Sequence, residues 1–505
     1  MTSQVSEFPA ERTFQYQHSL PPLPVPSLEG SLAKYLDAVR PFATEEEYQV
    51  TAAVVKRFGE GIGKDLHQKL LQRARTRRNW LEEWWLDAAY LELRYPSQLN
   101  VNFGGPAPYL EHCWPPTEGV QLRRTSISMW HTLQYWDLLR TYNHLLILLR
   151  LLNNMCCEGE PAGDGVSALT SEERTRWAKA REYLIGIDPA NKTILETIQS
   201  SLFVVSLDDA KPYATAEDYT PVPLTGDPTI RWGDKSYNSI SFADGTFGSN
   251  CDHVPYDAMV LVTQGYYVDQ QLKGSETVRP MPLPEELVFT VDDRVRSDVA
   301  HAKQQYFETD LQVVCYAFTL FGKAAIKQKK LHPDTFIQLA LQLAYYRQHG
   351  RSGSCYETAM TRSFYHGMTE TMRPCTLEAQ NWCHTMLLPA ASVRRKALLL
   401  AFNKHNKLMA EAQNGKGFDR HLLGLYLIAK DEGLPMPDLF NYPLYSKSGR
   451  GGNFVLSTSL VGYTTVLGAV APMVHHCYGF FYRIGDDGDL SQYVGSSHSM
   501  LVMAV

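Results

Sequence analysis

The stretch 231–259, RWGDKSYNSISFADGTFGSNCDHVPYDAM, constrains the fold more than any other part of the chain, because its local pattern changes abruptly. Residues 239–242 read as a strand, and Asp244-Gly245 with Gly248 supplies the sharp turns that strands need at their ends. Pro255 suits the first turn of a helix. The segment is therefore predicted to pass from a strand through a loop into the start of a helix.

His253 follows the predicted strand and forms an H-x-x-x-D motif with Asp257. An imidazole with a pKa of about 6.5 is largely neutral near pH 7, so it can accept a proton from a hydroxyl or a thiol. One alternative is an ordinary loop or core histidine followed by a helix-start carboxylate, which the positive helix end favours. Another makes Cys251 a nucleophile with His253 as its base, although alternation along a strand guarantees no hydrogen bond between them.

Length, charge and cysteine usage bound the class of protein. The 505 residues suffice for two domains or one large two-lobed unit with a buried core. A net charge of -6 and a pI near 6.3 argue against a nucleic-acid partner, so an anionic ligand needs a local basic site. The nine cysteines include no C-x-x-C pair, and we interpret them as reduced intracellular thiols rather than disulfides or a metal site.

Neither a secretory signal nor a transmembrane segment is expected. The N-terminal residues 1–17 have no basic region followed by an apolar one. The most apolar run, 145–152, is interrupted by Arg150 and is far shorter than the ~20 residues that span a bilayer.

Four stretches, together with His253, carry a resemblance to a known family: the proline-rich segment 20–28, NWLEEWWL at 79–86, NVNF at 100–103 and RWGDKS at 231–236. They resemble the carnitine/choline acyltransferase family. The resemblance implies an α/β (α+β) fold of the chloramphenicol-acetyltransferase-like type, with two lobes that each hold a mixed sheet flanked by helices. It also implies that His253 is the catalytic base, and we interpret Asp257 as support for its loop.

The lysine-rich segment 323–330 comes before a predicted helix. From composition alone it reads as a solvated basic loop, but ammonium groups and the N–H groups at a helix start also attract phosphate. In the family this region binds coenzyme A. The resemblance therefore assigns coenzyme A binding to six residues: Lys327, Leu331, His332, Pro333, Asp334 and Thr335.

The segment 355–373 is dense in tyrosine and threonine, which often means only a polar sheet face. The resemblance implies that four residues bind carnitine: Tyr356, Thr358, Thr369 and, as the charged partner of its carboxylate, Arg420. Arginine suits a carboxylate because of its two-pronged geometry. Relatives carry arginine where Met368 stands, so the predicted carnitine site departs from the family at this position.

Ser459 and Gly468 complete the predicted site. The triplet 457–459 is a weak motif alone, but the resemblance makes the Ser459 hydroxyl the donor to the oxyanion formed from the thioester carbonyl. Gly468 falls where acetyl-specific relatives have a bulky methionine, which favours a medium acyl chain. The alternative for Gly468 is a strand bulge.

Two segments depart from the family, and the chain is divided around them. The first lobe is expected to be internally deleted near 144–166, and the C-terminal tail also diverges, which points to a splice form or a gene-model error. Six parts are predicted: an extended arm at 1–30, the helical part of the N-terminal lobe at 31–143, a junction at 144–166, the rest of that lobe with His253 at 167–330, a C-terminal lobe with the carnitine and acyl sites at 331–484, and a tail at 485–505.

The function implied is reversible transfer of a medium-chain, octanoyl-like acyl group between coenzyme A and the hydroxyl of carnitine, in fatty-acid transport and β-oxidation. No covalent enzyme intermediate, cofactor or metal is expected, since acyl-CoA is a substrate. The alternatives are a non-catalytic protein that binds coenzyme A or acyl-carnitine, and a chain that does not fold stably. A monomer is expected. The resemblance implies a peroxisomal location, although the final residues 503–505 are no peroxisomal signal, and a cytoplasmic location is the alternative.

Overall fold

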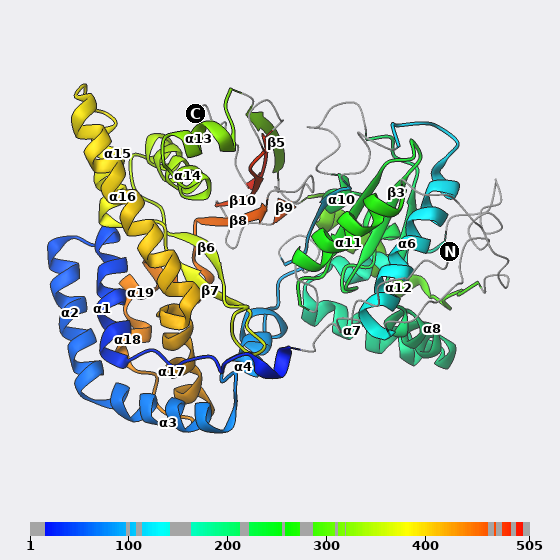
Figure 1. The fold of residues 1–505 in the computed structure, drawn as a ribbon. Coiled ribbons are helices and arrows are strands. Elements are labelled where there is room, and N and C mark those ends of the chain that lie inside the picture. The colour runs from blue at the N-terminus through cyan, green and yellow to red at the C-terminus, as the bar shows by residue number, and fades with distance from the viewer. Residues whose placement is uncertain are drawn as a thin grey trace, which may run out of the picture. The chain divides into compact units, whose positions relative to one another are not determined.

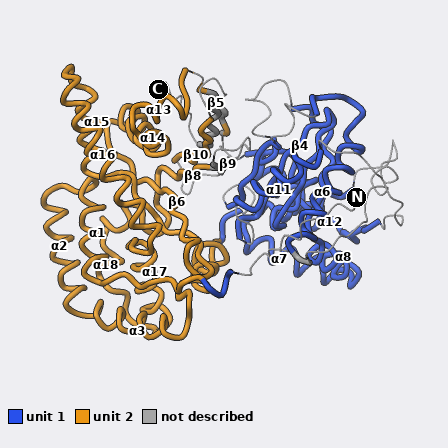
Figure 2. Tube along the Cα trace, viewed as in Figure 1, with its two compact units in different colours: residues 1–19, 94–309, 465–468 blue, residues 20–93, 310–464, 469–505 orange. Residues whose placement is uncertain are grey.

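The structure is a computed structural model in which the chain forms two compact units. Unit 1 comprises residues 1–19, 94–309 and 465–468, and unit 2 comprises residues 20–93, 310–464 and 469–505 (Figure 2). The structure describes residues 16–96, 101–107, 114–141, 163–212, 222–254, 258–272, 286–308, 312–318, 320–462, 469–470, 477–485 and 491–497.

Unit 1 contains a mixed sheet with helices packed on it (Figure 1). Its strands pair in the order β2 (Val204–Asp208), β3 (Asn238–Phe242), β4 (Phe247–Cys251) and β1 (Phe103–Pro106). The β2–β3 pair is parallel, and the other two pairs are antiparallel. The helical elements are η1 (Gln17–Ser19), α6 (Gln121–Thr141), η6 (Val166–Ser171), α7 (Arg174–Ile187), α8 (Pro189–Ser200), α10 (Val222–Thr225), η7 (Pro228–Ile230), α11 (Ala258–Leu272) and α12 (Asp293–Phe307).

The predicted strand at 239–242 lies within β3, and the predicted turn at Gly245 follows it, whereas β4 occupies residues that the sequence analysis took for a loop. All residues of both strands are buried, and Gly245 adopts a φ of 73° in the turn, a conformation that residues with a Cβ rarely take. Gly104 pairs with Asn250 across β1 and β4, where an added Cβ would lie 2.0 Å from the carbonyl oxygen of Ser249. The close approach of these two strands therefore requires glycine at position 104.

Unit 2 contains a six-stranded mixed sheet. Its order is β5 (Gln312–Phe318), β11 (Ser491–Ser497), β10 (Tyr478–Arg483), β8 (Leu456–Gly462), β6 (Cys355–Met360) and β7 (Thr369–Met372). The β10–β8 and β8–β6 pairs are parallel, whereas the remaining pairs are antiparallel. The short strand β9 (Ala469–Val470) also belongs to the residues of this unit.

Helices account for most of the rest of unit 2. They are α1 (Leu28–Val39), η2 (Arg40–Phe42), α2 (Glu45–Glu60), α3 (Ile62–Thr76), α4 (Glu82–Leu86), η3 (Asp87–Leu91), α13 (Lys323–Gln328), α14 (Pro333–His349), α15 (Leu377–Thr385), α16 (Ala391–Glu411), η8 (Ala412–Lys416), α17 (Asp419–Asp431), α18 (Asp438–Asn441), α19 (Pro443–Lys447) and η9 (Arg450–Gly452). Side-chain caps define the N-termini of α1 and α2. Ser27 caps α1, and Thr44 forms a capping box with Glu47 on α2.

The α/β class with two mixed sheets flanked by helices is confirmed, but the division of the chain differs from the predicted one. Residues 31–93, assigned to the N-terminal lobe with 94–143, lie in unit 2. The reason is a shared core, in which Tyr35, Leu66 and Trp80 join one hydrophobic cluster with Leu422 and Leu425 of α17. Packing that joins residues so far apart in sequence leaves no trace in local periodicity.

Two further parts of the predicted division differ. Residues 310–330, assigned to the N-terminal lobe, lie in unit 2 with strand β5 and helix α13. The tail 485–505 supplies β11, which pairs with both β5 and β10 inside the sheet. Helix α7 begins at Arg174, where the side chain of Glu173 accepts hydrogen bonds from the first-turn N–H groups.

Some expectations concern residues outside the described part of the chain. Pro255 lies there, and so does most of the junction 144–166. Within the described ranges, no helix has both the length and the apolar character needed to cross a bilayer.

Candidate active site

His253 follows the end of β4, a strand that the sequence analysis did not predict. Its ring meets the ring of Phe103 edge to face, with centroids 4.8 Å apart and planes at 62°. Phe103 is 1% exposed and pairs with Cys251 across β1 and β4, so the sheet core fixes the surface on which the imidazole rests. His253 itself is only partly buried. This position differs from that of an ordinary core histidine and leaves the imidazole accessible.

Three buried asparagines fix the loop that begins the 231–236 run. Asn102 Nδ2 donates to the carbonyl of Gly233 at 2.8 Å and to Asn250 Oδ1 at 2.7 Å. Asn238 Oδ1 accepts a hydrogen bond from the N–H of Trp232 at 2.9 Å, and Asn238 Nδ2 donates to the carbonyls of Trp232 and Asn250. All three asparagines are at most 1% exposed, and within the described residues Asn102 Oδ1 and Asn250 Nδ2 have no hydrogen-bond partner, so the network is only partly satisfied. The network joins β1, β3 and β4 next to His253.

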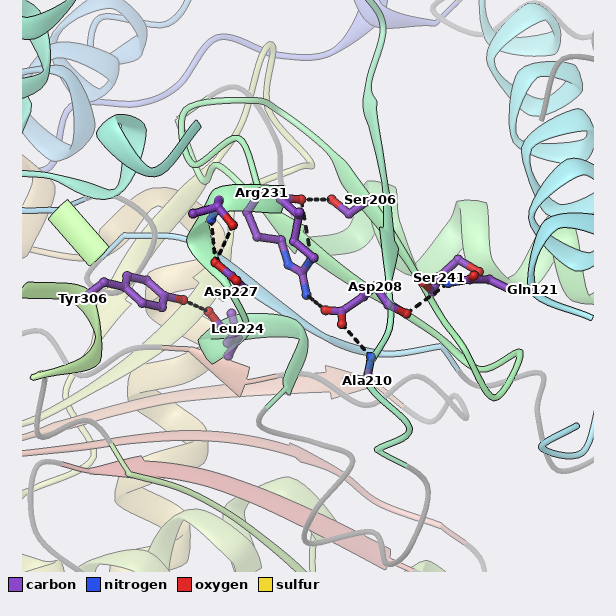
Figure 3. Close-up of polar contacts among 11 residues, drawn as sticks. Gln121, Ser206, Asp208, Ala210, Leu224, Asp227, Arg231, Ser241 and Tyr306 are labelled. Atoms are coloured by element: carbon purple, nitrogen blue, oxygen red, sulfur yellow. Dashed lines mark hydrogen bonds and ion pairs between the residues drawn. The ribbon is translucent and has the colours of Figure 1, made fainter. Parts of the chain in front are cut away.

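Arg231, the first residue of that run, is anchored to Asp208 at the end of β2 (Figure 3). Its guanidinium donates to Asp208 Oδ2 at 2.6 Å, and the side chain of Arg231 is fully buried. Asp208 also accepts the N–H of Ala210 at 2.9 Å, while Gln121 Nε2 reaches the carbonyls of Asp208 and Ser241. The conspicuous arginine of the motif is therefore a structural anchor for the end of β2.

Lys235 and Asp234 are likewise held by the surrounding helices. Lys235 Nζ donates to the carbonyls of Ile198 at 2.7 Å and Gln199 at 3.1 Å at the end of α8. The indole of Trp177 donates to Asp234 Oδ2 at 2.7 Å. Burial raises the pKa of Asp234, although the Trp177 hydrogen bond opposes the rise. These polar groups of the run thus position the loop.

Asp252, directly before His253, is a residue that the sequence analysis missed. It is 4% exposed and its Oδ1 accepts the N–H of Val254 at 3.1 Å, which closes the backbone around the histidine. Arg174 Nη2 lies 4.0 Å from its Oδ2. Burial raises the pKa of Asp252, with its backbone hydrogen bond and Arg174 acting in the opposite sense. The sequence did offer one signal for Asp252, because it is a short polar residue directly before the predicted catalytic histidine.

The alternative in which Cys251 is a nucleophile does not fit its surroundings. The thiol is fully buried, and burial raises its pKa well above the usual range. A nucleophilic cysteine needs a thiolate and access to its substrate. Asp257, the other residue of the motif, lies outside the described residues.

In unit 2, three of the predicted residues share one face of the sheet. Tyr356 and Thr358 are partly exposed, whereas the alternating Cys355 and Glu357 of β6 are buried. Tyr356 pairs with Ser457 of the parallel strand β8, so Ser459, two residues on, lies on the same face as Tyr356 and Thr358. Ser459 is also partly exposed. The structure therefore brings the predicted carnitine hydroxyls and the predicted oxyanion donor together.

The opposite face of these strands is closed by α14. Thr458 Oγ1 donates to the carbonyl of Tyr356 at 2.7 Å and contacts Gln338. Gln338 Nε2 also donates to the Tyr482 hydroxyl at 2.8 Å. Since Thr458, Gln338 and Tyr482 are all buried, the register of β8 against β6 is fixed from behind.

Thr369 and Arg420 lie next to one another. Arg420 Nε donates to the carbonyl of Thr369 at 3.2 Å and Nη2 to its Oγ1 at 3.4 Å, while the guanidinium stacks 3.6 Å above the Trp85 ring. Thr369 pairs with Met360 across β7 and β6, which places it on the face of Tyr356 and Thr358. Arg420 is 8% exposed, so its main contacts are with the protein.

A small pocket adjoins this pair. It is lined by Thr369, Arg420 and the departing residue Met368, among others, and Tyr356 and Thr358 are not part of its wall. Glu370 also lines it, and its Oε1 accepts the N–H groups of Thr371 at 2.8 Å and Arg420 at 3.1 Å. Burial raises the pKa of Glu370 to about 7.

The six predicted coenzyme A residues divide by exposure. Lys327 and His332 are exposed, and Leu331 is partly exposed. Pro333 and Thr335 are buried in the first turn of α14, where Thr335 Oγ1 donates to Asn406 Oδ1 at 2.6 Å. Lysines therefore remain available to an anion, and the first turn of α14 serves the fold.

Asp334, the sixth, is tied to the sheet. Its Oδ1 accepts the hydroxyl of Tyr482 at 2.5 Å. Burial and then the nearby Glu357 raise the pKa of Asp334 to about 6. Gly468, the predicted acyl-pocket residue, lies outside the described residues.

Comparison with known proteins gives consistent matches. The family described as Choline/Carnitine o-acyltransferase matches residues 23–145 and 142–500. Peroxisomal carnitine O-octanoyltransferase of Bos taurus is 57% identical over 572 positions, covering 96% of this chain and 94% of that protein. The Homo sapiens protein of that name is 54% identical with the same coverage. Carnitine O-acetyltransferase of Homo sapiens is 31% identical over 556 positions, covering 93% and 88%.

Likeness among solved structures is weaker. F. graminearum TRI101 complexed with ethyl coenzyme A aligns at 11% identity with a TM-score of 0.35, covering 80% of this chain and 92% of that chain, which is too low to bear on function.

The alignments also bear on the two departures. The 572 aligned positions exceed the 505 residues of the chain, so the Bos taurus relative carries residues that have no counterpart here. The family match is broken into two pieces that overlap at 142–145, next to the predicted junction. Its second piece runs to residue 500 and so includes most of the 485–505 tail that the sequence analysis had set apart.

Proposed function

Because the chain belongs to the choline/carnitine acyltransferase family, we propose that it transfers a medium-chain acyl group reversibly between coenzyme A and the hydroxyl of carnitine. Two relatives more than half identical to it are named carnitine O-octanoyltransferase, which supports an octanoyl-like chain over acetyl. The observation that carries the proposal is the accessible His253 imidazole, held on Phe103 at the end of β4 within the matched segment.

We assign the proton transfer to His253. The neutral imidazole takes the proton of the carnitine hydroxyl, and the resulting alkoxide attacks the thioester carbonyl of acyl-CoA. The tetrahedral intermediate then collapses with cleavage of the C–S bond, and the imidazolium gives its proton to the departing thiolate of coenzyme A. In the reverse direction the same imidazole takes the proton of the coenzyme A thiol. The buried loop network supports this role, since a base must be held in place to within fractions of an ångström.

The remaining roles are assigned to unit 2. The Ser459 hydroxyl donates to the oxyanion that forms during attack, and Tyr356, Thr358 and Thr369 bind carnitine. Arg420 supports Thr369 through two hydrogen bonds, and it supplies positive charge for the carnitine carboxylate. Lys327 and the 331–335 segment bind coenzyme A, with the exposed lysines attracting its phosphates.

The experiment is thiol release from octanoyl-CoA with and without L-carnitine, together with mass spectrometry of the acyl product. Release that requires carnitine and yields octanoylcarnitine is expected. Octanoyl-CoA binding without carnitine-dependent release would instead favour a non-catalytic binding protein, although no observation favours that alternative. A cooperative thermal transition in the same sample excludes a chain that does not fold.

Location and assembly are also proposed. The peroxisomal relatives support a peroxisomal location for this chain. We propose that it acts as a monomer and requires no cofactor or metal. Equilibrium sedimentation and activity after dialysis against a chelator test these two points.

A further inference from the structure

Helix α16 begins in a segment of unusual charge. Residues 379–410 contain no aspartate or glutamate but carry five lysines and arginines, although the whole chain has a net charge of -6. Three of these cations, Arg394, Arg395 and Lys396, follow one another in the first two turns of the helix. Within the described part of the chain, none of these three forms an ion pair with a carboxylate.

Large apolar side chains are exposed beside these cations. Leu387 and Leu388, in the turn between α15 and α16, are 66% and 49% exposed. Val393, Leu399 and Leu400 on α16 are 45%, 40% and 53% exposed. We call these five residues and the three cations at 394–396 the α16 patch.

The helical repeat makes the patch continuous. Arg395 and Leu399 are one turn apart on the helix, as are Lys396 and Leu400, so cations and leucines occupy successive turns of one outward stripe. The opposite side of α16 packs inward through Ala397 and Ala401. The stripe is therefore not the core-facing side of the helix, and the part of the chain that the structure describes leaves it exposed.

The helix start adds to this character. Ala390 precedes α16 and offers no side-chain cap, so the first-turn N–H groups keep their affinity for anions. Figure 1 shows the first turns of α16, in yellow, extending past the neighbouring helices of unit 2. A projecting end with leucines and cations suits a flat anionic surface better than it suits a groove.

We propose that the α16 patch binds the surface of a membrane that contains anionic lipids. The leucines enter the boundary between headgroups and acyl chains, and the three cations and the helix start contact lipid phosphates. This binding is peripheral and reversible. It would keep the chain close to lipid without any residue crossing the bilayer.

Vesicle sedimentation tests the proposal on the full-length chain. Phosphatidylcholine vesicles with about a third phosphatidylserine are compared with pure phosphatidylcholine vesicles. Association is expected with the acidic vesicles and is expected to weaken as salt is raised, because surface charge is screened. Equal association with both compositions, or none with either, would overturn the proposal.

Matched variants separate the patch from net charge. Each cation near an acidic surface contributes a factor of about five, so R395Q with K396Q is expected to weaken association about thirtyfold. The control, K56Q with K64Q, removes the same charge from exposed positions on α2 and α3 and is expected to change association less than about twofold. If the two double variants weaken association equally, the binding depends on the overall charge of the protein and not on the α16 patch, which contradicts the proposal.

The apolar contribution and the other possible occupants are tested in the same way. L399S with L400S is expected to weaken association about tenfold or more, while thermal unfolding and octanoyl transfer in solution stay as in the control. If the lipid-free chain sediments as a dimer that L399S with L400S dissociates, a second copy covers the patch. Binding to polyglutamate but not to vesicles would assign it to an acidic protein. Either result contradicts the membrane proposal.

Discussion

The two units hold their candidate residues by different means. In unit 1 a single imidazole follows a strand, and its loop is fixed by buried side chains from distant segments, such as Asn102 reaching the carbonyl of Gly233. In unit 2 the hydroxyls follow the alternation of β6, with Tyr356 and Thr358 on one face. A network depends on each of its members, whereas a strand face depends mainly on register. Substitutions should therefore act at a distance in unit 1 and locally in unit 2.

Among substitutions in unit 2, replacing Ser459 with alanine is expected to have the largest effect on kcat. A small effect would contradict the expectation that one hydroxyl of this strand face acts locally. Loss of one oxyanion donor lowers kcat by about 10²- to 10³-fold, with little change in the affinity for octanoyl-CoA. Steady-state kinetics of octanoyl transfer measure both. Ser457→Ala on the same strand is the control and should retain most activity. Equal losses in the two variants would mean that the strand, not one hydroxyl, is what matters.

The buried carboxyl group of Glu370 on β7 should make the stability of unit 2 depend on pH. Burial raises its pKa from 4.5 to about 7, so the folded state binds the proton more tightly than the unfolded state does. Its contribution to the free energy of unfolding is full below pH ~4.5 and is lost as the pH rises through ~7, by on the order of 3 kcal/mol.

Glu370→Gln keeps the acceptor oxygen and removes the titration. The difference in Tm between the variant and the natural chain should therefore shift in favour of the variant from pH 5 to pH 8. Thermal unfolding at both pH values measures it. A difference that does not change with pH would show that this carboxyl does not titrate in that window.

Gly104→Ala sharpens the account of unit 1. The new methyl group would lie 2.0 Å from the Ser249 carbonyl oxygen, so β1 must move away from β4. Stability is expected to fall by about 1–3 kcal/mol, and kcat should fall too, since the neighbouring Phe103 carries the His253 ring.

The matched control for that change is Gly186→Ala on α7, where a Cβ has nothing within 4 Å and alanine favours the helix. Chemical denaturation and octanoyl transfer are measured on both variants. Stability lost without any loss of kcat would show that the imidazole does not depend on the β1–β4 approach.

The smallest effect is expected at Lys327. The exposed ammonium attracts phosphate through solvent, so Lys327→Gln should raise the KM for octanoyl-CoA about five-fold at low salt and less at high salt. Lys192→Gln, exposed on α8, is the control. An unchanged KM at low salt would remove this lysine from the coenzyme A site.

Local features of the fold could be predicted from the sequence. Gly245 marks the turn after β3 because a left-handed φ favours glycine. The hydroxyls of Tyr356 and Thr358 fall on one face because strand alternation is a local property.

Long-range contacts could not be predicted in this way. The chain from Leu20 to Leu93 joins unit 2 because its apolar side chains pack with α17, more than 300 residues away. Polar side chains such as Asn238 and Asn250 look like surface residues in the sequence, and only the pairing of β3 with β4 buries them together. The hydrogen bonds from Arg420 to Thr369 likewise join residues far apart in the sequence, and the role of Arg420 toward carnitine stays a prediction.

The account rests on the His253 imidazole acting as a base and not as a binding group. The most direct test compares turnover and octanoyl-CoA affinity in His253→Ala, by kinetics and by calorimetry on the same preparation. We expect turnover to fall by about 10²- to 10⁴-fold while the Kd for octanoyl-CoA changes less than about twofold. Retained turnover, or a loss of affinity in proportion to the loss of turnover, would contradict the assignment.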